Sequence, residues 1–283
     1  MFSTNNLKIY TFSDSENKKF RKIVLDKMTK ACDADAECDD GIGTLSEKQM
    51  HAAIKQFICP DESKHEIKIQ DSALYIQKED EKKRKFVADV LDGSTIYEIQ
   101  TGSFAPLKDK IKWILDNTAY NIVLIHPMPE RLYVSYIEED GKISPRKKSN
   151  RSRKLKHIVG ELYHIKEFIN NPRFTLIALM IEADQYRRRV TVKQRVRTKK
   201  YETIPSSLIC AHIFERGDDY KIFLPESLGG EFTVKQFSKE SGILGIDAYS
   251  AVKLLCELGH ICECGKIGKA KSYKKVTRDT TVQ

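Results

Sequence analysis

Residues Val87–Gly102, VADVLDGSTIYEIQTG, decide how this sequence is interpreted. Asp92-Gly93 separates two apolar-rich runs, and a DG pair in that position is a strong signal for a β-hairpin. Side chains alternate between the two faces of a strand, so Glu98 and Gln100 share one face of the second run. Two polar side chains on one strand face indicate a site rather than a plain core.

Asp89 lies on the first arm of this predicted hairpin and Glu98 on the second. The hairpin therefore brings two carboxylates next to each other, and they repel unless a cation or a proton lies between them. Hard oxygen ligands with an open position suit Mg²⁺ or Mn²⁺. The sequence thus predicts a divalent-metal site at Asp89 and Glu98.

The elements around the hairpin follow the order helix, three strands, helix, strand. Spacing of apolar residues predicts a first helix over Thr44–Ile58, and alternation predicts strands before the hairpin. Ser103 and Pro106 are suited to the start of the next helix, whose apolar face includes Leu107 and Ile111. The remaining expected strands are His65–Gln70, Ala73–Ile76 and the apolar run Asn121–His126.

Asp89 followed by Glu98-Ile99-Gln100, in this order of elements, resembles the PD-(D/E)XK nuclease superfamily. That superfamily has an αβββαβ core and an Asp, spacer, Glu/Asp-x-Lys motif. Gln100 stands where the motif has Lys, a variant also met in the superfamily. The resemblance implies that Asp89 and Glu98, helped by the Ile99 carbonyl, hold the metal and that Gln100 orients the attacking water.

Two further site residues follow from this resemblance. The first helix of the family often offers a Glu to the metal, which here is Glu47; a capping box with Thr44 is an equal alternative. In Gln variants a Lys of the following helix supplies the missing charge, and Lys108 is the candidate nearest the site. The alternative is that the lysines of this helix all face solvent. His51 is expected on the surface of the first helix.

Net charge is +9 and unevenly distributed. Residues 1–100 carry a net charge of −3 and residues 101–283 carry +12. A strong positive skew points to a polyanion, most simply nucleic acid, although a merely solvated basic surface stays open. The basic stretches are Arg146–Lys156, Arg187–Lys200 and Lys266–Lys275. In the first of them, Arg146, Lys147 and Lys148 are predicted to bind DNA phosphates near the site.

Residues Glu231–Val276 resemble a winged helix-turn-helix. Helices over Val234–Glu240 and Ala248–Leu258, the second capped by Asp247, precede strands at Ile261–Cys264 and Lys271–Val276, an order typical of that motif. A role in protein contact is the alternative, because fold does not decide function. The expected groove-facing residues are Tyr249, Ser250 and Lys253, and the expected phosphate contacts are Lys266, Lys269 and Lys271.

The predicted fold class is therefore α/β, with a restriction-endonuclease-like αβββαβ core, a mixed sheet and a C-terminal winged-helix domain. The expected divisions are an N-terminal extension (1–44), a nuclease-like domain (45–186), a basic linker or strand pair (187–204) and a winged-helix domain (205–283). The segment from Asp89 to Arg187 also resembles a family of uncharacterised prokaryotic proteins with such a core.

Composition narrows the class of protein. No apolar run approaches the ~20 residues that a bilayer requires, and the first residues lack a secretory signal, so a cytoplasmic protein without a membrane partner is expected. Seven scattered cysteines argue against a disulfide framework. Cys262 and Cys264 lack a partner at zinc-binding spacing.

The function predicted first is a Mg²⁺- or Mn²⁺-dependent endonuclease, a hydrolase of double-stranded DNA, with a role in restriction or mobile-element defence by resemblance only. The absent Lys favours an alternative: a non-catalytic DNA-binding or regulatory protein with a degenerate nuclease core. A third reading, a protein-interaction module, predicts no salt-sensitive DNA affinity. Cleavage at two sites would favour a homodimer, although no clear dimer element is visible in the sequence.

Overall fold

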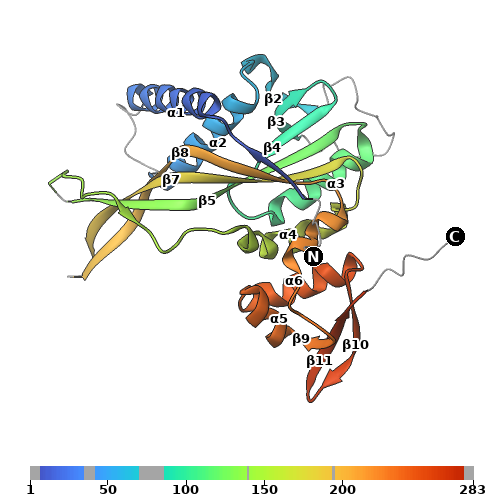
Figure 1. The fold of residues 1–283 in the computed structure, drawn as a ribbon. Coiled ribbons are helices and arrows are strands. Elements are labelled where there is room, and N and C mark those ends of the chain that lie inside the picture. The colour runs from blue at the N-terminus through green and yellow to red at the C-terminus, as the bar shows by residue number, and fades with distance from the viewer. Residues whose placement is uncertain (1–6, 35–41, 70–85, 139, 193–194, 277–283) are drawn as a thin grey trace.

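The computed structural model describes residues 7–34, 42–69, 86–138, 140–192 and 195–276. A mixed sheet with the strand order β1-β8-β7-β5-β4-β3-β2 forms the centre of the molecule, and β6 pairs with β5 (Figure 1). Helices cover both faces, so the predicted α/β class with a mixed sheet is confirmed. Ala73–Ile76, a predicted strand, lies outside the described residues.

The strands of this sheet differ in direction. The meander β2-β3-β4 is antiparallel, β4, β5 and β7 are parallel to one another, and β8 and β1 complete the other side in antiparallel pairing. Their bounds are β1 Lys8–Thr11, β2 His65–Lys68, β3 Val87–Asp92, β4 Thr95–Ile99, β5 Asn121–Ile137, β6 Lys147–Lys148, β7 Phe174–Val192 and β8 Arg195–Phe214.

Two hydrophobic clusters lie on opposite faces of the sheet. Helices α1 (Asp14–Ala34) and α2 (Ile42–Ile58) cover one face, while α3 (Lys108–Asn117) and α4 (Val159–Ile165) cover the other. A parallel connection such as β4 to β5 requires a crossover, and α3 supplies it. Short 3₁₀ helices are η2 Glu62–Lys64, η4 Ala105–Leu107, η5 Leu155–Ile158, η6 Lys166–Phe168 and η7 Gly217–Phe223.

Strand β5 continues through two prolines, where the sequence predicted a strand ending at His126 and a separate hairpin arm. The Ile125 carbonyl accepts the Gln100 N–H, so it points toward β4. Every second residue points to the same side, and Pro127 and Pro129 therefore face the edge that β4 leaves uncovered after Ile99. No ladder hydrogen bond is lost there, and β5 runs on with a register shift after Pro129.

Residues 187–192 and 195–204 lie in strands β7 and β8 rather than in a linker. Arg187 pairs with Lys200 in the β7–β8 hairpin, whose far end projects from the body as an arm (Figure 1). Strand β8 then runs to Phe214 through the point where a second domain was expected to begin. Residues 8–34 also join the main body rather than forming an extension, because β1 pairs with β8 and α1 packs on α2.

The C-terminal part places two helices beside a small sheet of order β10-β11-β9. The Thr233 hydroxyl and the Gln236 side chain form a capping box at the start of α5, and Gly242 ends that helix at a φ of 63°. Gly245, and not Asp247 as predicted, is the N-cap of α6. The bounds are β9 Glu231–Thr233, α5 Val234–Ser241, α6 Ile246–Glu257, β10 Ile261–Ile267 and β11 Ala270–Lys275.

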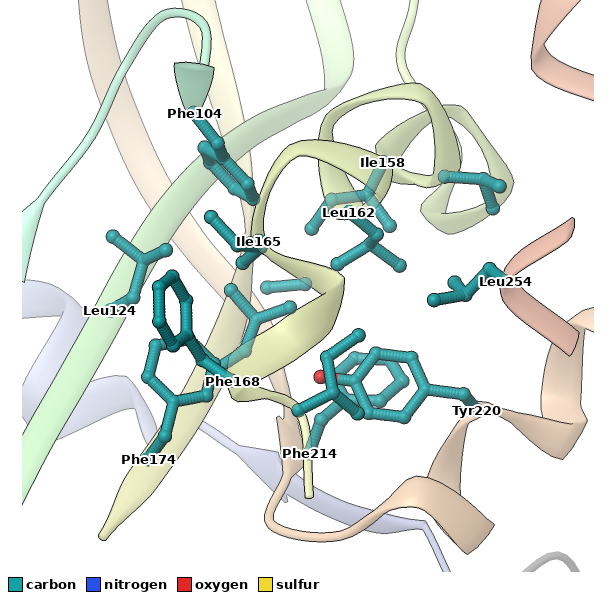
Figure 2. Close-up of a cluster of buried hydrophobic side chains, with 14 of the residues drawn as sticks. Phe104, Leu124, Ile158, Leu162, Ile165, Phe168, Phe174, Phe214, Tyr220 and Leu254 are labelled. Atoms are coloured by element: carbon teal, nitrogen blue, oxygen red, sulfur yellow. The ribbon is translucent and has the colours of Figure 1, made fainter. Parts of the chain in front are cut away.

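The C-terminal part shares one core with the central sheet. Figure 2 shows Leu254 of α6 facing the region of Ile158 and Leu162, with Tyr220 and Phe214 alongside. All five side chains are buried at 2% exposure or less. Burying each large apolar side chain contributes about 1.5–3 kcal/mol, so this contact fixes the C-terminal part against α4.

Candidate active site

A cavity of about 720 Å³ opens at the end of β4. We call it the acidic cavity because three carboxylates line it. Residues from α2, β2, β3, β4 and α3 form its wall, so segments that are distant in the sequence meet here. They are His51, Ala52, Lys55, Glu66, Asp89, Glu98, Ile99, Gln100, Thr101, Leu107 and Lys110.

Asp89 lies where β3 and β4 separate. Their ladder ends at Val90 and Tyr97, and beyond it the Ile99 N–H donates to Asp89 Oδ2 at 2.8 Å. His51 Nε2 lies 3.0 Å from the same oxygen. Burial alone would raise the pKa of Asp89, but the hydrogen bonds from His51 and Ile99 lower it below its ordinary value. Asp89 is therefore a stable carboxylate at neutral pH.

Glu98 is almost completely buried, with 3% exposure. Lys110 Nζ donates to Glu98 Oε2 at 2.6 Å and to the Val87 carbonyl at 2.6 Å. Glu98 Oε1 is buried without a hydrogen-bond partner in the described part of the chain. Burial raises the pKa of Glu98 to about 7, with Lys110 opposing and Asp89 adding to the shift. One oxygen of this buried carboxyl group is therefore an unused acceptor among the described residues.

Lys110, and not Lys108, supplies the helix charge at this site. Lys108 forms an ion pair with Glu167 at 3.1 Å on the surface, whereas Lys110 contacts Glu98. Positions two residues apart point to opposite sides of a helix. The spacing does not separate the two, because Lys110 follows Leu107 by three residues and Lys108 precedes Ile111 by three, so both flank the apolar face.

His51 was expected on the helix surface, and its contact with Asp89 was missed. It follows Met50 of the buried stripe by one residue, which places it at the edge of the packed face. Only the separation of β3 from β4, a tertiary feature, brings Asp89 to that edge. The side chain of Glu47 lies outside the described residues, although its backbone is part of α2.

Gln100 is held at the cavity wall by three hydrogen bonds. Its Nε2 donates to the Ser103 carbonyl at 2.6 Å, and its backbone N–H donates to the Ile125 carbonyl at 2.9 Å. The Gln100 carbonyl lies 2.6 Å from Nδ1 of the buried His126. The carboxamide is thus oriented by the turn that follows β4, while the Ile99 carbonyl belongs to the same stretch of the wall.

The donor atoms in the acidic cavity are hard oxygens. Among the described residues, no group of three His, Cys, Asp or Glu is arranged to bind a metal ion. Mg²⁺ is commonly held by one or two carboxylates together with substrate phosphates, and it keeps several waters. Asp89 and the unpaired Oε1 of Glu98 fit that pattern, and they do not fit the four-ligand pattern of structural zinc.

Arg146 is neutralised within the fold rather than free to bind phosphates. Its guanidinium donates to Glu182 at 2.9 Å and to Asp184, and it stacks on the Tyr133 ring at 3.5 Å. Hydrogen bonding to Asp184 raises the pKa of Arg146. Lys147 and Lys148, which were also predicted to bind DNA phosphates, are exposed in β6.

The predicted DNA-binding residues of the C-terminal part differ in their surroundings. Tyr249 is 61% exposed, but Lys253 lies 5.6 Å from the Tyr163 ring of α4. One side of α6 is thus turned toward α4. Lys271 pairs with Glu263 at 2.9 Å. Ser250 is partly buried. Lys266 and Lys269 are exposed and form no ion pair in the described part of the chain.

Comparison with known proteins identifies a family without an assigned activity. Residues 48–215 match the family described as "Domain of unknown function (DUF8091)", and the chain belongs to this family. The matched range includes every residue named above in the acidic cavity. No described helix has the length and apolar character needed to cross a membrane.

A curated relative is an uncharacterized protein of Treponema pallidum (strain Nichols), 25% identical over 145 residues. The match covers 50% of this chain and 51% of the relative, so the chain spans about half the length of the curated relative it matches. No solved structure is significantly similar to the chain.

Proposed function

We propose that this chain is a metal-dependent nuclease that hydrolyses phosphodiester bonds of DNA. The observation that carries the proposal is Glu98, buried in the cavity wall beside Asp89 with Oε1 unpaired. Leaving a buried polar atom without a partner costs about 1–3 kcal/mol, and more for a charged group. A bound divalent cation would remove that cost.

The arrangement of elements supports a restriction-endonuclease-like core. Helix α2 precedes the antiparallel meander β2-β3-β4, and α3 connects β4 to the parallel strand β5. This is the order αβββαβ. In the C-terminal part, the order β9, α5, α6, β10, β11 supports a winged helix that positions the protein on DNA.

The carboxylates of Asp89 and Glu98, with the Ile99 carbonyl, would hold Mg²⁺ or Mn²⁺. When bound, such an ion lowers the pKa of a coordinated water and stabilises charge on the scissile phosphate. His51, with its proton on Nε2, donates to Asp89 Oδ2 and fixes the orientation of that carboxylate. The backbone N–H of Ile99 donates to the same oxygen.

Lys110 takes the role of the lysine that the strand lacks. Its Nζ is 2.6 Å from Glu98 Oε2, at the cavity wall where the charge of the phosphate would develop. A preorganised cation at that position stabilises the transition state more than the bound substrate. Gln100, held by the Ser103 carbonyl, orients the water through its amide oxygen.

A second candidate is a non-catalytic DNA-binding protein. The favouring observation is that Lys110 already compensates Glu98, while no three His, Cys, Asp or Glu among the described residues are arranged to hold a metal ion. In this reading the acidic cavity is a degenerate remnant and only the basic surfaces are functional.

A cleavage assay decides between the two. Plasmid DNA is incubated with the wild-type chain, Asp89→Asn and Glu98→Gln, with Mg²⁺, with Mn²⁺ or with EDTA. The nuclease proposal predicts metal-dependent cleavage by the wild type and none by either variant. Glu66→Gln is the matched control, because Glu66 lines the same cavity but pairs with Lys55 at 2.7 Å, and it keeps wild-type cleavage. Equal cleavage by all four proteins, or by none, would contradict the proposal.

A further inference from the structure

A second cavity, of about 340 Å³, adjoins the acidic one, and Thr101 lines both. We call it the basic cavity because its described wall contains four cationic side chains and no acidic one. The cations come from the loop before α4 and from the β7–β8 hairpin. The full lining is Met50, Thr101, Gly102, Pro127, Pro129, Leu132, Arg151, Arg153, Gln185, Arg187, Lys200 and Thr203.

The gap in the sheet after β4 makes room for this cavity. Strand β4 ends at Ile99, so the edge of β5 that carries Pro127 and Pro129 is not covered by another strand. The Pro129 carbonyl instead accepts the Arg153 backbone N–H at 2.8 Å. This hydrogen bond brings the loop with Arg151 and Arg153 against β5, directly beyond the acidic cavity.

No carboxylate among the described residues neutralises these four cations. In the part of the chain that the structure describes, Arg151, Arg153, Arg187 and Lys200 form no ion pair; the Arg187 Nε–H donates to the neutral Gln185 Oε1 at 2.7 Å. Nearby Arg189 behaves differently, since it pairs with Glu138 at 3.2 Å. Within the described residues, the nearby Arg189 is compensated and the cations of the cavity wall are not.

The pairing of β7 with β8 places like charges against each other. Arg187 lies opposite Lys200, and Arg188 lies opposite Lys199. Like charges directly across an antiparallel pair are destabilising. Successive pairs face opposite sides of a hairpin, so only the Arg187–Lys200 pair lies at the cavity, and a polyanion bound there removes the cost of that pair.

We propose that the basic cavity binds the phosphodiester backbone of DNA, next to the bond that lies in the acidic cavity. The position of that bond rests on the proposed nuclease function; the backbone contact does not. Arginine binds phosphate oxygens through two parallel N–H groups, and the wall offers three arginines. Further exposed cations, Arg188, Arg197 and Lys199, lie on the other face of the same hairpin and outside the cavity wall.

The test measures how salt weakens binding. A fluorescently labelled DNA duplex is titrated with the full chain in EDTA at several salt concentrations, and affinity is read from anisotropy. Each phosphate contact adds about 0.9 to the slope of log affinity against log salt. The variant Arg151→Ala/Arg187→Ala is expected to bind more weakly and to reduce this slope by about 2. An unchanged slope overturns the proposal.

A matched control removes two charges elsewhere. Lys18→Ala/Lys22→Ala, on exposed positions of α1, keeps the wild-type slope if the effect is local. An equal fall in this control would show a general charge effect and overturn the proposal. Lys200→Ala, a single change at an exposed position, is expected to lower the slope by about 1 without affecting thermal melting, which separates lost contact from lost fold.

Two further arms separate this proposal from others. Glu98→Gln keeps the wild-type slope while losing cleavage, whereas the double arginine variant loses both. If the wild type never cleaves but the slope falls in the arginine variant, the nuclease function fails and the backbone contact stands. If inorganic phosphate raises the melting temperature of the wild type only, and both proteins bind duplex equally, the cavity binds free phosphate and the backbone contact is wrong.

Discussion

The acidic and basic cavities meet at Thr101, but the protein treats their charges in opposite ways. In the acidic cavity, Lys110 pairs with Glu98 and Lys55 pairs with Glu66. In the basic cavity, the neutral Gln185 is the side-chain partner of Arg187 among the residues that the structure describes. Charges that the fold compensates hold local geometry, and charges that it leaves uncompensated are available to a ligand.

The largest effect is expected from removing the ion pair between Lys110 and Glu98 in the acidic cavity. Lys110→Met removes the cation 2.6 Å from Glu98 Oε2, and we expect cleavage to fall about 10²–10³-fold, the usual effect of losing one preorganised electrostatic group. Initial rates of plasmid cleavage in Mg²⁺ measure it. Lys108→Met is the matched control on the same helix and keeps the wild-type rate, because Lys108 pairs with Glu167 instead. Loss in both variants would mean that the helix charge acts nonspecifically.

The next effect concerns pH and the metal-free fold. The pKa of Glu98 in the folded state, about 7, lies above its ordinary value, so the folded protein favours the protonated side chain. The contribution of this group to the free energy of unfolding is complete at low pH and is lost as pH rises through about 7. The Gln side chain of Glu98→Gln does not ionise. Between pH 5 and pH 8, the wild type should therefore lose about 2–3 kcal/mol of its free energy of unfolding in EDTA relative to this variant. Urea unfolding at the two pH values tests this. Curves that shift equally in both proteins would disprove the raised pKa.

A smaller effect sharpens the contrast by using a compensated cation. Arg146→Ala loses the ion pairs with Glu182 and Asp184 and the stacking on Tyr133, which is worth about 1 kcal/mol for groups this exposed. Thermal melting should fall accordingly, while the salt slope of DNA binding stays at the wild-type value. Lys147→Ala, an exposed neighbour, should leave the melting temperature unchanged. A lower slope for Arg146→Ala would break the proposed distinction between the two kinds of cation.

The smallest expected effect lies in the C-terminal part. Lys266 and Lys269 are exposed near the β10–β11 turn and lie outside the two cavities, so we expect each to contribute less to DNA binding than a cavity arginine. Lys266→Ala/Lys269→Ala should lower the salt slope by about 1, half the change expected for the two arginines. Lys271→Ala should change it less, since Glu263 already pairs with Lys271. A larger fall in the salt slope than that of the arginine variant would make the β10–β11 hairpin the main DNA contact.

Much of the fold was predictable because its signals are local. The hairpin at Asp92-Gly93 forms as expected, with Gly93 at a φ of 58°, a conformation that glycine adopts without strain. The strand alternation that set Glu98 apart from Tyr97 is also present: Glu98 is buried and Tyr97 is half-buried. Such patterns depend only on neighbours in the chain.

The remainder depended on contacts that no local pattern encodes. The position of Glu98 relative to α3 decides that Lys110, and not Lys108, reaches it. His51 reaches Asp89 only because β3 and β4 separate. The continuation of β5 through Pro127 was missed, since a proline in a strand argues against it unless one edge is free. Which edge is free depends on where β4 stops, and that is a property of the whole sheet.

The two prolines of β5 have a consequence for the sheet itself. Pro127 and Pro129 have no N–H group. A strand that extended beyond Ile99 along this edge would therefore lack a hydrogen-bond donor at two successive pairing positions. The gap in the sheet after the end of β4 therefore follows from the covalent structure of β5. A further strand, from this chain or another molecule, cannot form a regular ladder there, and the edge of β5 that lines the basic cavity stays uncovered.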